Sequence, residues 1–83
     1  MTYELVYSEE SLKQLKKLEK DIQNRILSSL ERCRIRPHAH IKKLVGNPYF
    51  RLRVGKYRVI LDVKDDKLII LVLEVAHRSR IYG

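Results

Sequence analysis

An alternating stretch interrupted by one glycine constrains the fold of this sequence more than any other feature. Residues 49–54 and 57–63 place apolar side chains at every second position, the pattern of a β-strand with one buried face. Gly55 and Lys56 stand between them, and glycine at the first position of a two-residue turn is typical of a type II′ hairpin. We therefore expect an antiparallel hairpin that buries one face and exposes the other.

A two-residue turn also fixes which residues of the hairpin face each other. Counting back from the turn, Arg53 faces Arg58, and Arg51 lies two positions further along the same face. Two arginines directly across an antiparallel pair repel each other and lower stability. A sheet that carries them is therefore expected to bind an anion. The alternative is a surface network in which Asp62 and Glu74 neutralise the arginines.

Apolar spacing before the hairpin predicts two helical segments. Ser8 is a suitable N-cap for a first helix that ends near Leu18, and Asp21 is a suitable N-cap for a second. Pro37 disfavours a helical conformation of the residue before it, so the second helix is expected to end at about Arg36. The spacing fits either a helical hairpin or one helix kinked near Lys20.

The order of the expected elements predicts the fold class. The other expected segments are a strand at 2–7, a loop at 37–48, a turn at Asp65-Asp66 and a strand at 68–76. An N-terminal strand, a helical hairpin and a three-stranded antiparallel meander make a two-layer α+β fold, with one sheet and the helices packed on one face. We expect residues 1–83 to form a single domain.

Cysteine content and hydropathy bear on the compartment. The single cysteine, Cys33, falls on the apolar stripe of the second helix, so we expect it to pack in the core, with a reactive thiol as the minor alternative. One cysteine excludes an internal disulfide and fits a reducing cytoplasm. The N-terminus lacks the pattern of a signal peptide, and no apolar run reaches the roughly 18 residues of a membrane span. A cytoplasmic protein without a membrane role is expected.

Positive charge is concentrated in the middle of the chain. The net charge is +8, and the segment from Arg32 to Arg58 contains nine basic residues and no acidic one. Such an excess favours nucleic acid, an anionic membrane surface or an acidic protein as partner. The membrane surface is the weakest of the three, because the basic residues do not lie along one amphipathic helix with aromatic anchors.

Arginine is well suited to phosphate, because its planar fork donates two parallel charge-assisted hydrogen bonds. RNA cleavage without a metal needs a base, a cation near the phosphorus and an acid. The sequence has no cluster with metal-ligand spacing, so neither a metal nor another cofactor is expected. His77 and Tyr82 are the candidates for proton transfer. Tyr82 can equally stack on a base, and His77 can equally have a structural role at a strand end.

Two segments of the sequence resemble a known family. The stretch KKLVGNPYFRLRVGKYRVILDV, followed by LEVAHRSRIY, is similar to the RelE-like branch of the RelE/ParE toxin superfamily. The resemblance implies the fold expected above and a toxin that enters the ribosomal A site and cuts the bound mRNA, with the RNA 2′-hydroxyl as the attacking group. It also implies a RelB-like antitoxin, and an acidic partner of this kind suits the net charge.

The resemblance implies that Arg58 and Arg78 match the family's phosphate-contacting arginines and that Tyr82 matches its C-terminal tyrosine. Together with the basic charge of the sequence, it leads to the following expected site residues. The expected catalytic residues are Arg58, Arg78, Tyr82 and His77. The expected RNA- and phosphate-binding residues are Arg51, Arg53, Lys42, Lys43, Lys56 and Arg80. Arg51 and Arg53 stand where RelE-like toxins often carry lysines, and because arginine is a poor base, an acid–base role of those lysines is not carried over. His77 stands where members vary between lysine and histidine.

Two other functions remain open from the sequence. A ParE-like protein that poisons DNA gyrase by binding would share the fold and the charge. A non-catalytic RNA-binding or ribosome-associated module would need only the basic face. Arginines in one cluster together with a terminal tyrosine favour the ribosome-dependent endoribonuclease over both.

Overall fold

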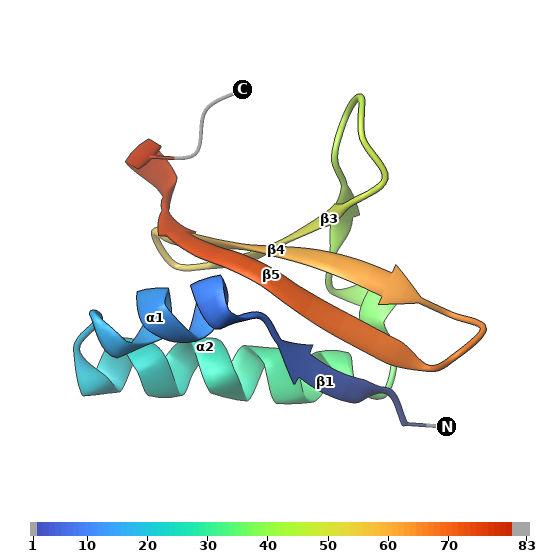
Figure 1. Cartoon of the computed structure of the whole chain (residues 1–83), viewed down its shortest axis with the longest axis horizontal. Helices are drawn as coiled ribbons and strands as arrows, with labels where there is room; N and C mark the ends of the chain where they lie inside the picture. The colour runs from blue at the N-terminus through green and yellow to red at the C-terminus, as the bar shows by residue number, and fades with distance from the viewer. Residues whose placement is uncertain (1, 81–83) are drawn as a thin grey trace.

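The protein folds into a helical layer and a sheet layer, described over residues 2–80 by a computed structural model (Figure 1). The elements are β1 (Glu4–Tyr7), α1 (Glu9–Lys16), α2 (Lys20–Cys33), η1 (Pro37–Ala39), β2 (Lys42–Lys43), β3 (Phe50–Val54), β4 (Tyr57–Lys64), β5 (Ile69–His77) and η2 (Arg78–Arg80). Both α-helices lie on one side of the sheet, which confirms the expected α+β fold. None of the helices in this range is long and apolar enough to cross a membrane.

The five strands form one mixed sheet in the order β1-β5-β4-β3-β2. Strands β3, β4 and β5 make the expected antiparallel meander, and β1 pairs parallel with β5 at one edge. Residues 37–48 are not a plain loop as predicted, because they contain η1 and the short strand β2. Two adjacent lysines carry no apolar alternation, so the sequence gives no strand signal there. Strand β2 forms where the unpaired edge of β3 offers it backbone partners.

The β3–β4 hairpin has the register predicted from the turn. Val54 pairs with Tyr57, and Arg53 pairs with Arg58. Gly55 has a φ of +57°, in the left-handed region that glycine enters without a steric penalty. A positive φ at the first turn position is what a type II′ turn requires. Local turn chemistry therefore sets the alignment of the two central strands.

A β-bulge explains why the last strand shows no clean alternation. The register shifts by one residue between Ile60 and Leu61 of β4, so Leu73 of β5 is left without a cross-strand partner. The bulge lets Val72 and Val75 share the buried face although they are three positions apart. On a regular strand, side chains at that spacing point to opposite faces.

Two separate helices form, as the helical-hairpin alternative predicted. Ser8 caps α1, and its Oγ accepts the N–H of Ser11 at 3.0 Å. The predicted N-cap at Asp21 is wrong, because the N-cap is Glu19, two residues earlier, and α2 begins at Lys20. Asp21 instead lies in the first turn of α2, where its carboxylate interacts favourably with the helix dipole.

Helix α2 ends at Cys33, earlier than expected from Pro37. The backbone carbonyl of Arg34 accepts the N–H of Tyr3 at 2.8 Å, and Arg34 Nε donates to the Tyr3 carbonyl at 2.9 Å. These bonds draw the residue after the helix towards the start of the chain. The helix therefore ends where Arg34 makes this tertiary contact, three residues before Pro37.

The core lies between α2 and the sheet. The fully buried side chains include Ile26, Leu30 and Cys33 of α2 with Val59, Leu61, Ile70 and Val72 of β4 and β5. Cys33 has the packing position that was predicted. Burial raises the pKa of its thiol, because a low dielectric disfavours the thiolate.

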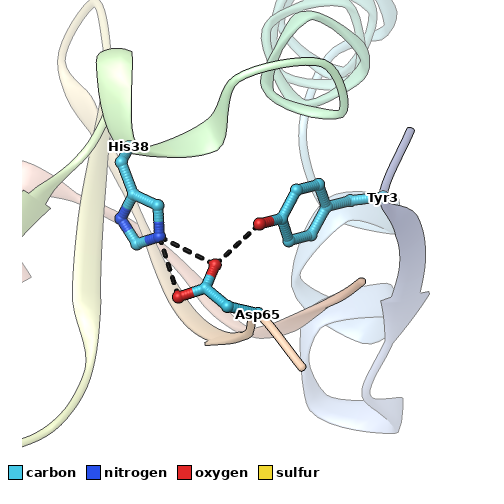
Figure 2. A network of polar contacts seen from close by, with 3 residues as sticks. All are labelled: Tyr3, His38 and Asp65. Atoms are coloured by element: carbon cyan, nitrogen blue, oxygen red, sulfur yellow. Dashed lines mark hydrogen bonds and ion pairs between the residues drawn. The ribbon is translucent and has the colours of Figure 1, made fainter. Parts of the chain in front are cut away.

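A polar network holds the β4–β5 turn, which covers residues 65–68 and is longer than the predicted two-residue turn (Figure 2). Tyr3 donates its hydroxyl hydrogen to Asp65 Oδ1 at 2.7 Å. His38 Nε2 lies 2.9 and 3.2 Å from the two carboxylate oxygens of Asp65. The hydrogen bond from Tyr3 lowers the pKa of Asp65 most, and the one to His38 lowers it further. The Tyr3–Asp65 hydrogen bond also raises the pKa of Tyr3. Leu68 ends the turn with a φ of +54°.

Candidate functional site

The side of the sheet remote from the helices carries the predicted arginines. Leu52 and Val54 of β3 are only 5% and 7% exposed and face the helices. Side chains alternate along a strand, so Arg51 and Arg53 lie on the other side. The same alternation in β4 places Arg58 there, directly opposite Arg53. The structure therefore brings these three guanidinium groups to one face, as expected.

Two rows of side chains cross the sheet on this side. The first row holds Lys42, Arg51, Ile60 and Glu74. The second row holds Arg53, Arg58 and Ala76. Cross-strand neighbours in such rows have Cβ atoms about 4.5–5.5 Å apart. We call the four cations of the two rows, Lys42, Arg51, Arg53 and Arg58, the cationic face.

Among the described residues 2–80, no carboxylate forms an ion pair with the cationic face. Asp62, one of the two candidates for neutralising it, pairs instead with Lys64, with 3.2 Å between Oδ2 and Nζ. Glu74 lies on the same side of the sheet, and within residues 2–80 it forms no ion pair with any member of the face. Because these charges lack an internal partner in that range, the face is suited to an external anion.

The other two predicted lysines lie apart from the cationic face. Lys43 pairs with Phe50 on the helix-facing side, and its Nζ lies 6.0 Å from the Phe50 ring centroid. Lys56 is exposed at the hairpin turn, and its carbonyl accepts the N–H of Arg78 at 2.6 Å. The structure thus brings the backbone of the exposed Arg78 to the turn, whereas Lys43 lies on the opposite face.

His77 also lies on the helix-facing side of the sheet. It pairs with Tyr57, which packs against the core, and the two rings meet edge to face with centroids 5.2 Å apart. His77 Nδ1 accepts the N–H of Ser79 at 3.2 Å and lies 2.8 Å from Ser79 Oγ. A neutral imidazole that accepts at Nδ1 carries its proton on Nε2. The structure therefore gives His77 a contact with η2 and does not bring its ring to Arg58.

Two predicted site residues are not fully covered by the structure. The backbone of Arg80 closes η2, but its side chain lies outside the described residues, as does all of Tyr82. Their predicted roles remain predictions. Within residues 2–80, histidine, cysteine and carboxylate side chains do not gather in threes that would hold a metal ion.

A polar groove beside the cationic face was missed by sequence reasoning. It has a volume of about 390 Å³ and lies between α2 and the β3–β4 hairpin. The lining residues are Asn24, Arg25, Ser28, Ser29, Arg32, Arg53, Val54 and Gly55. The residues at 25, 28, 29 and 32 have the spacing of one helix face, which was the available signal. That spacing does not reveal which strand the face borders.

Comparison with known proteins places this arrangement in a family. The family model described as the ParE toxin of type II toxin–antitoxin systems matches residues 5–82. A RelE-like toxin protein of Escherichia coli is 36% identical over 96% of this chain and 87% of its own length. The mRNA interferase toxin RelE of Escherichia coli strain K12 is 30% identical over the same shares of the two chains.

A solved structure agrees with these sequence matches. A chain of the archaeal RelE–RelB complex from Pyrococcus horikoshii has a TM-score of 0.83 at 28% identity, and the match covers 98% of this chain and 100% of that one. Sequence, fold and element order thus point to the same relatives. The chain therefore belongs to the RelE/ParE superfamily of type II toxin–antitoxin toxins, as a RelE-like member.

Proposed function

We propose that this toxin is a metal-independent endoribonuclease that cleaves mRNA on the ribosome and so inhibits translation in the cytoplasm. The observation that carries the proposal is the Arg53–Arg58 pair, two guanidinium groups directly opposite each other with no carboxylate paired to them within residues 2–80. Two relatives at 30% identity are named mRNA interferases, which supports the same reaction.

In the proposed reaction, the RNA 2′-hydroxyl gives up its proton to a base, a protein side chain or solvent water, and its oxygen attacks the adjacent phosphorus. The O2′–P bond forms and the P–O5′ bond breaks, which leaves a 2′,3′-cyclic phosphate and a 5′-hydroxyl. Negative charge builds on the non-bridging oxygens of the transition state, where Arg58 and Arg78 donate charge-assisted hydrogen bonds. Arg51 and Arg53 hold the phosphates of the strand, and Lys42 extends that contact along the first row.

Proton transfer is assigned to the last residue of β5 and the C-terminal segment that follows it. Tyr82 is the first candidate for protonating the 5′-oxygen or for stacking on a base. His77 is the weaker candidate, because its Nδ1 lone pair already accepts from Ser79 and its ring contacts Tyr57. Lys43, Lys56 and Arg80 are proposed to contact RNA outside the reacting phosphodiester.

Two macromolecular partners follow from the proposal. The ribosome presents the message, and an acidic RelB-like antitoxin covers the cationic face when the toxin is inactive. The Pyrococcus horikoshii relative was solved as a RelE–RelB complex, which supports an antitoxin partner here. We further propose that residues 1–83 act as one domain.

Cleavage of ribosome-bound mRNA by single-residue variants tests the proposal. Arg58→Ala and Arg78→Ala are each expected to lower the cleavage rate by about 100-fold or more, the loss typical of one transition-state donor. Arg36→Ala removes an exposed arginine that is not part of the cationic face, in the segment before η1, and serves as the control. Normal cleavage by both Arg58→Ala and Arg78→Ala rules out the assignment.

A second candidate is a ParE-like toxin that poisons DNA gyrase, because the matching family model is that of the ParE toxins. The two functions differ in the nucleic acid that breaks after induction in cells. Rapid mRNA cleavage with intact chromosomes supports the endoribonuclease. Double-strand DNA breaks with intact message support the gyrase poison.

A further inference from the structure

The groove between α2 and the β3–β4 hairpin is connected to the cationic face through a shared residue. Arg53 belongs to the cationic face and also lines the groove, together with Arg25 and Arg32 of α2. Among residues 2–80, no carboxylate lines the groove, and none of these arginines forms an ion pair. Three like charges around one hollow repel each other, so the arrangement suits an anion supplied from outside.

The rest of the lining adds hydrogen-bond donors and a glycine, which has no side chain to fill the groove. Ser28 and Ser29 carry hydroxyl groups, and Asn24 carries an amide, all of which can donate to phosphate oxygens. The Arg25 guanidinium lies over Gly55, with its nitrogens 3.5 and 3.7 Å from where a Cβ would stand. The volume of about 390 Å³ lies within the range of small-ligand sites.

The edge of β3 leaves a route between the two sites. Strand β2 pairs only with Phe50 and Arg51, so within residues 2–80 the remainder of β3 has no strand on its outer edge. An extended polynucleotide bound on the cationic face can therefore continue round this edge. Arg53 lies where the strand would turn from one site into the other.

We propose that the groove binds a phosphodiester group of RNA, with Arg25 and Arg32 as its phosphate ligands and Arg53 as the link to the cationic face. The inference rests on the proposed RNA-cleaving function and adds a second phosphate subsite to it. The phosphodiester belongs either to the message or to ribosomal RNA, since both present the same charged group. Each phosphate contact to a single strand adds about 0.7 to the slope of log affinity against log salt.

Binding measurements with a double variant test the groove. Arg25→Gln/Arg32→Gln removes both α2 charges and keeps good helix formers at both positions. Lys13→Gln/Lys16→Gln removes two exposed charges at one-turn spacing on α1 and is the matched control. The probes are a short single-stranded RNA made uncleavable by 2′-deoxy substitution, and small ribosomal subunits without message.

The groove variant is expected to lose about tenfold in affinity for one of the two probes, with a salt slope smaller by about 0.7 to 1.4. The affinity of the control variant is expected to change by less than about threefold, because exposed lysines away from the bound RNA contribute only weak, screened interactions. Loss on the single-stranded RNA alone assigns the phosphate to the message. Loss on the ribosomal subunits alone assigns it to ribosomal RNA. Unchanged affinity for both probes overturns the proposal.

A second variant distinguishes loss of the binding site from loss of the fold. Ser28→Glu places a carboxylate three residues from Arg25 and four from Arg32, spacings at which ion pairs support a helix. The fold is therefore retained, while the charge of the three lining arginines is reduced by one and both α2 arginines gain a carboxylate partner. A loss of affinity in the same direction is expected. Wild-type affinity in this variant with unchanged circular dichroism also overturns the proposal.

The outcome is separate from that of the proposed function. Cleavage by Arg58→Ala tests the reaction, whereas the groove is tested by binding of RNA that cannot be cut. An inactive Arg58→Ala protein with an unaffected groove variant leaves the endoribonuclease standing and removes the groove. An active Arg58→Ala protein together with impaired binding by the groove variant argues against the endoribonuclease assignment and supports the groove as an RNA-binding site.

Discussion

Replacing Arg58 with glutamine should stabilise the fold and disable the reaction at the same time. Arg58 lies directly opposite Arg53 in the antiparallel register, and neither is ion-paired within residues 2–80. Like charges at such positions destabilise a sheet by about 0.2–1 kcal/mol. Two unit charges about 6 Å apart in water repel by about 0.7 kcal/mol, which falls in that range.

The expected gain is large enough to measure. For a domain of this size, 1 kcal/mol shifts the Tm by about 4–8 °C, so Arg58→Gln should raise the Tm by about 1–8 °C. Cleavage of ribosome-bound mRNA should fall by about 100- to 1,000-fold, because one donor to the transition-state charge is lost. The Tm should rise while the cleavage rate falls. This combination is expected of a charged residue that serves function at a cost in stability, and not of one that stabilises the fold.

Thermal unfolding at two salt concentrations and a double-mutant cycle make the assay specific. In about 1 M salt the Debye length is near 3 Å, so the gain in Tm should largely disappear. Arg53→Gln/Arg58→Gln should be little more stable than either single variant, since the repulsion is removed only once. Arg36→Gln, which lies in the segment before η1, should leave both readouts unchanged.

Two results would refute this reasoning. A lower Tm for Arg58→Gln at low salt would mean that Arg58 has a stabilising partner. Cleavage within about threefold of wild type would mean that the guanidinium does not act on the transition state.

Three further changes test other parts of the structure. Asp65→Asn should make the Tm less sensitive to pH below about 5, because the Tyr3 hydrogen bond lowers the pKa of folded Asp65. The ionised carboxylate stabilises the fold above the unfolded pKa of about 3.9, and this is lost as pH falls through the folded value. Equal Tm profiles for the two proteins would contradict that role. Cys33 should resist alkylation at neutral pH until denaturant is added, because its thiol is buried and has a raised pKa; rapid labelling of the native protein would argue against this. Gly55→Ala should lower the Tm by about 4 °C or more, since a left-handed φ costs other residues about 1–2 kcal/mol, and an unchanged Tm would mean that the turn can relax.

Local sequence determined the central hairpin and the face that it exposes. Alternation in β3 and β4 and the glycine at 55 act over a few residues, so their joint pattern fixed the Arg53–Arg58 register before any tertiary contact was known. The buried position of Cys33 followed in the same way from helical spacing. Each of these features depends on the conformational preferences of neighbouring residues.

Only the tertiary structure decided the features that join distant segments. The parallel pairing of β1 with β5, the end of α2 at the Tyr3 contact and the bulge at Leu73 each depend on partners far along the chain. The same holds for the ring of His77, which lies with Tyr57 on the helix-facing side, and for the groove where α2 meets β3. A one-dimensional pattern gives the face on which a side chain lies, but packing decides which element that face meets.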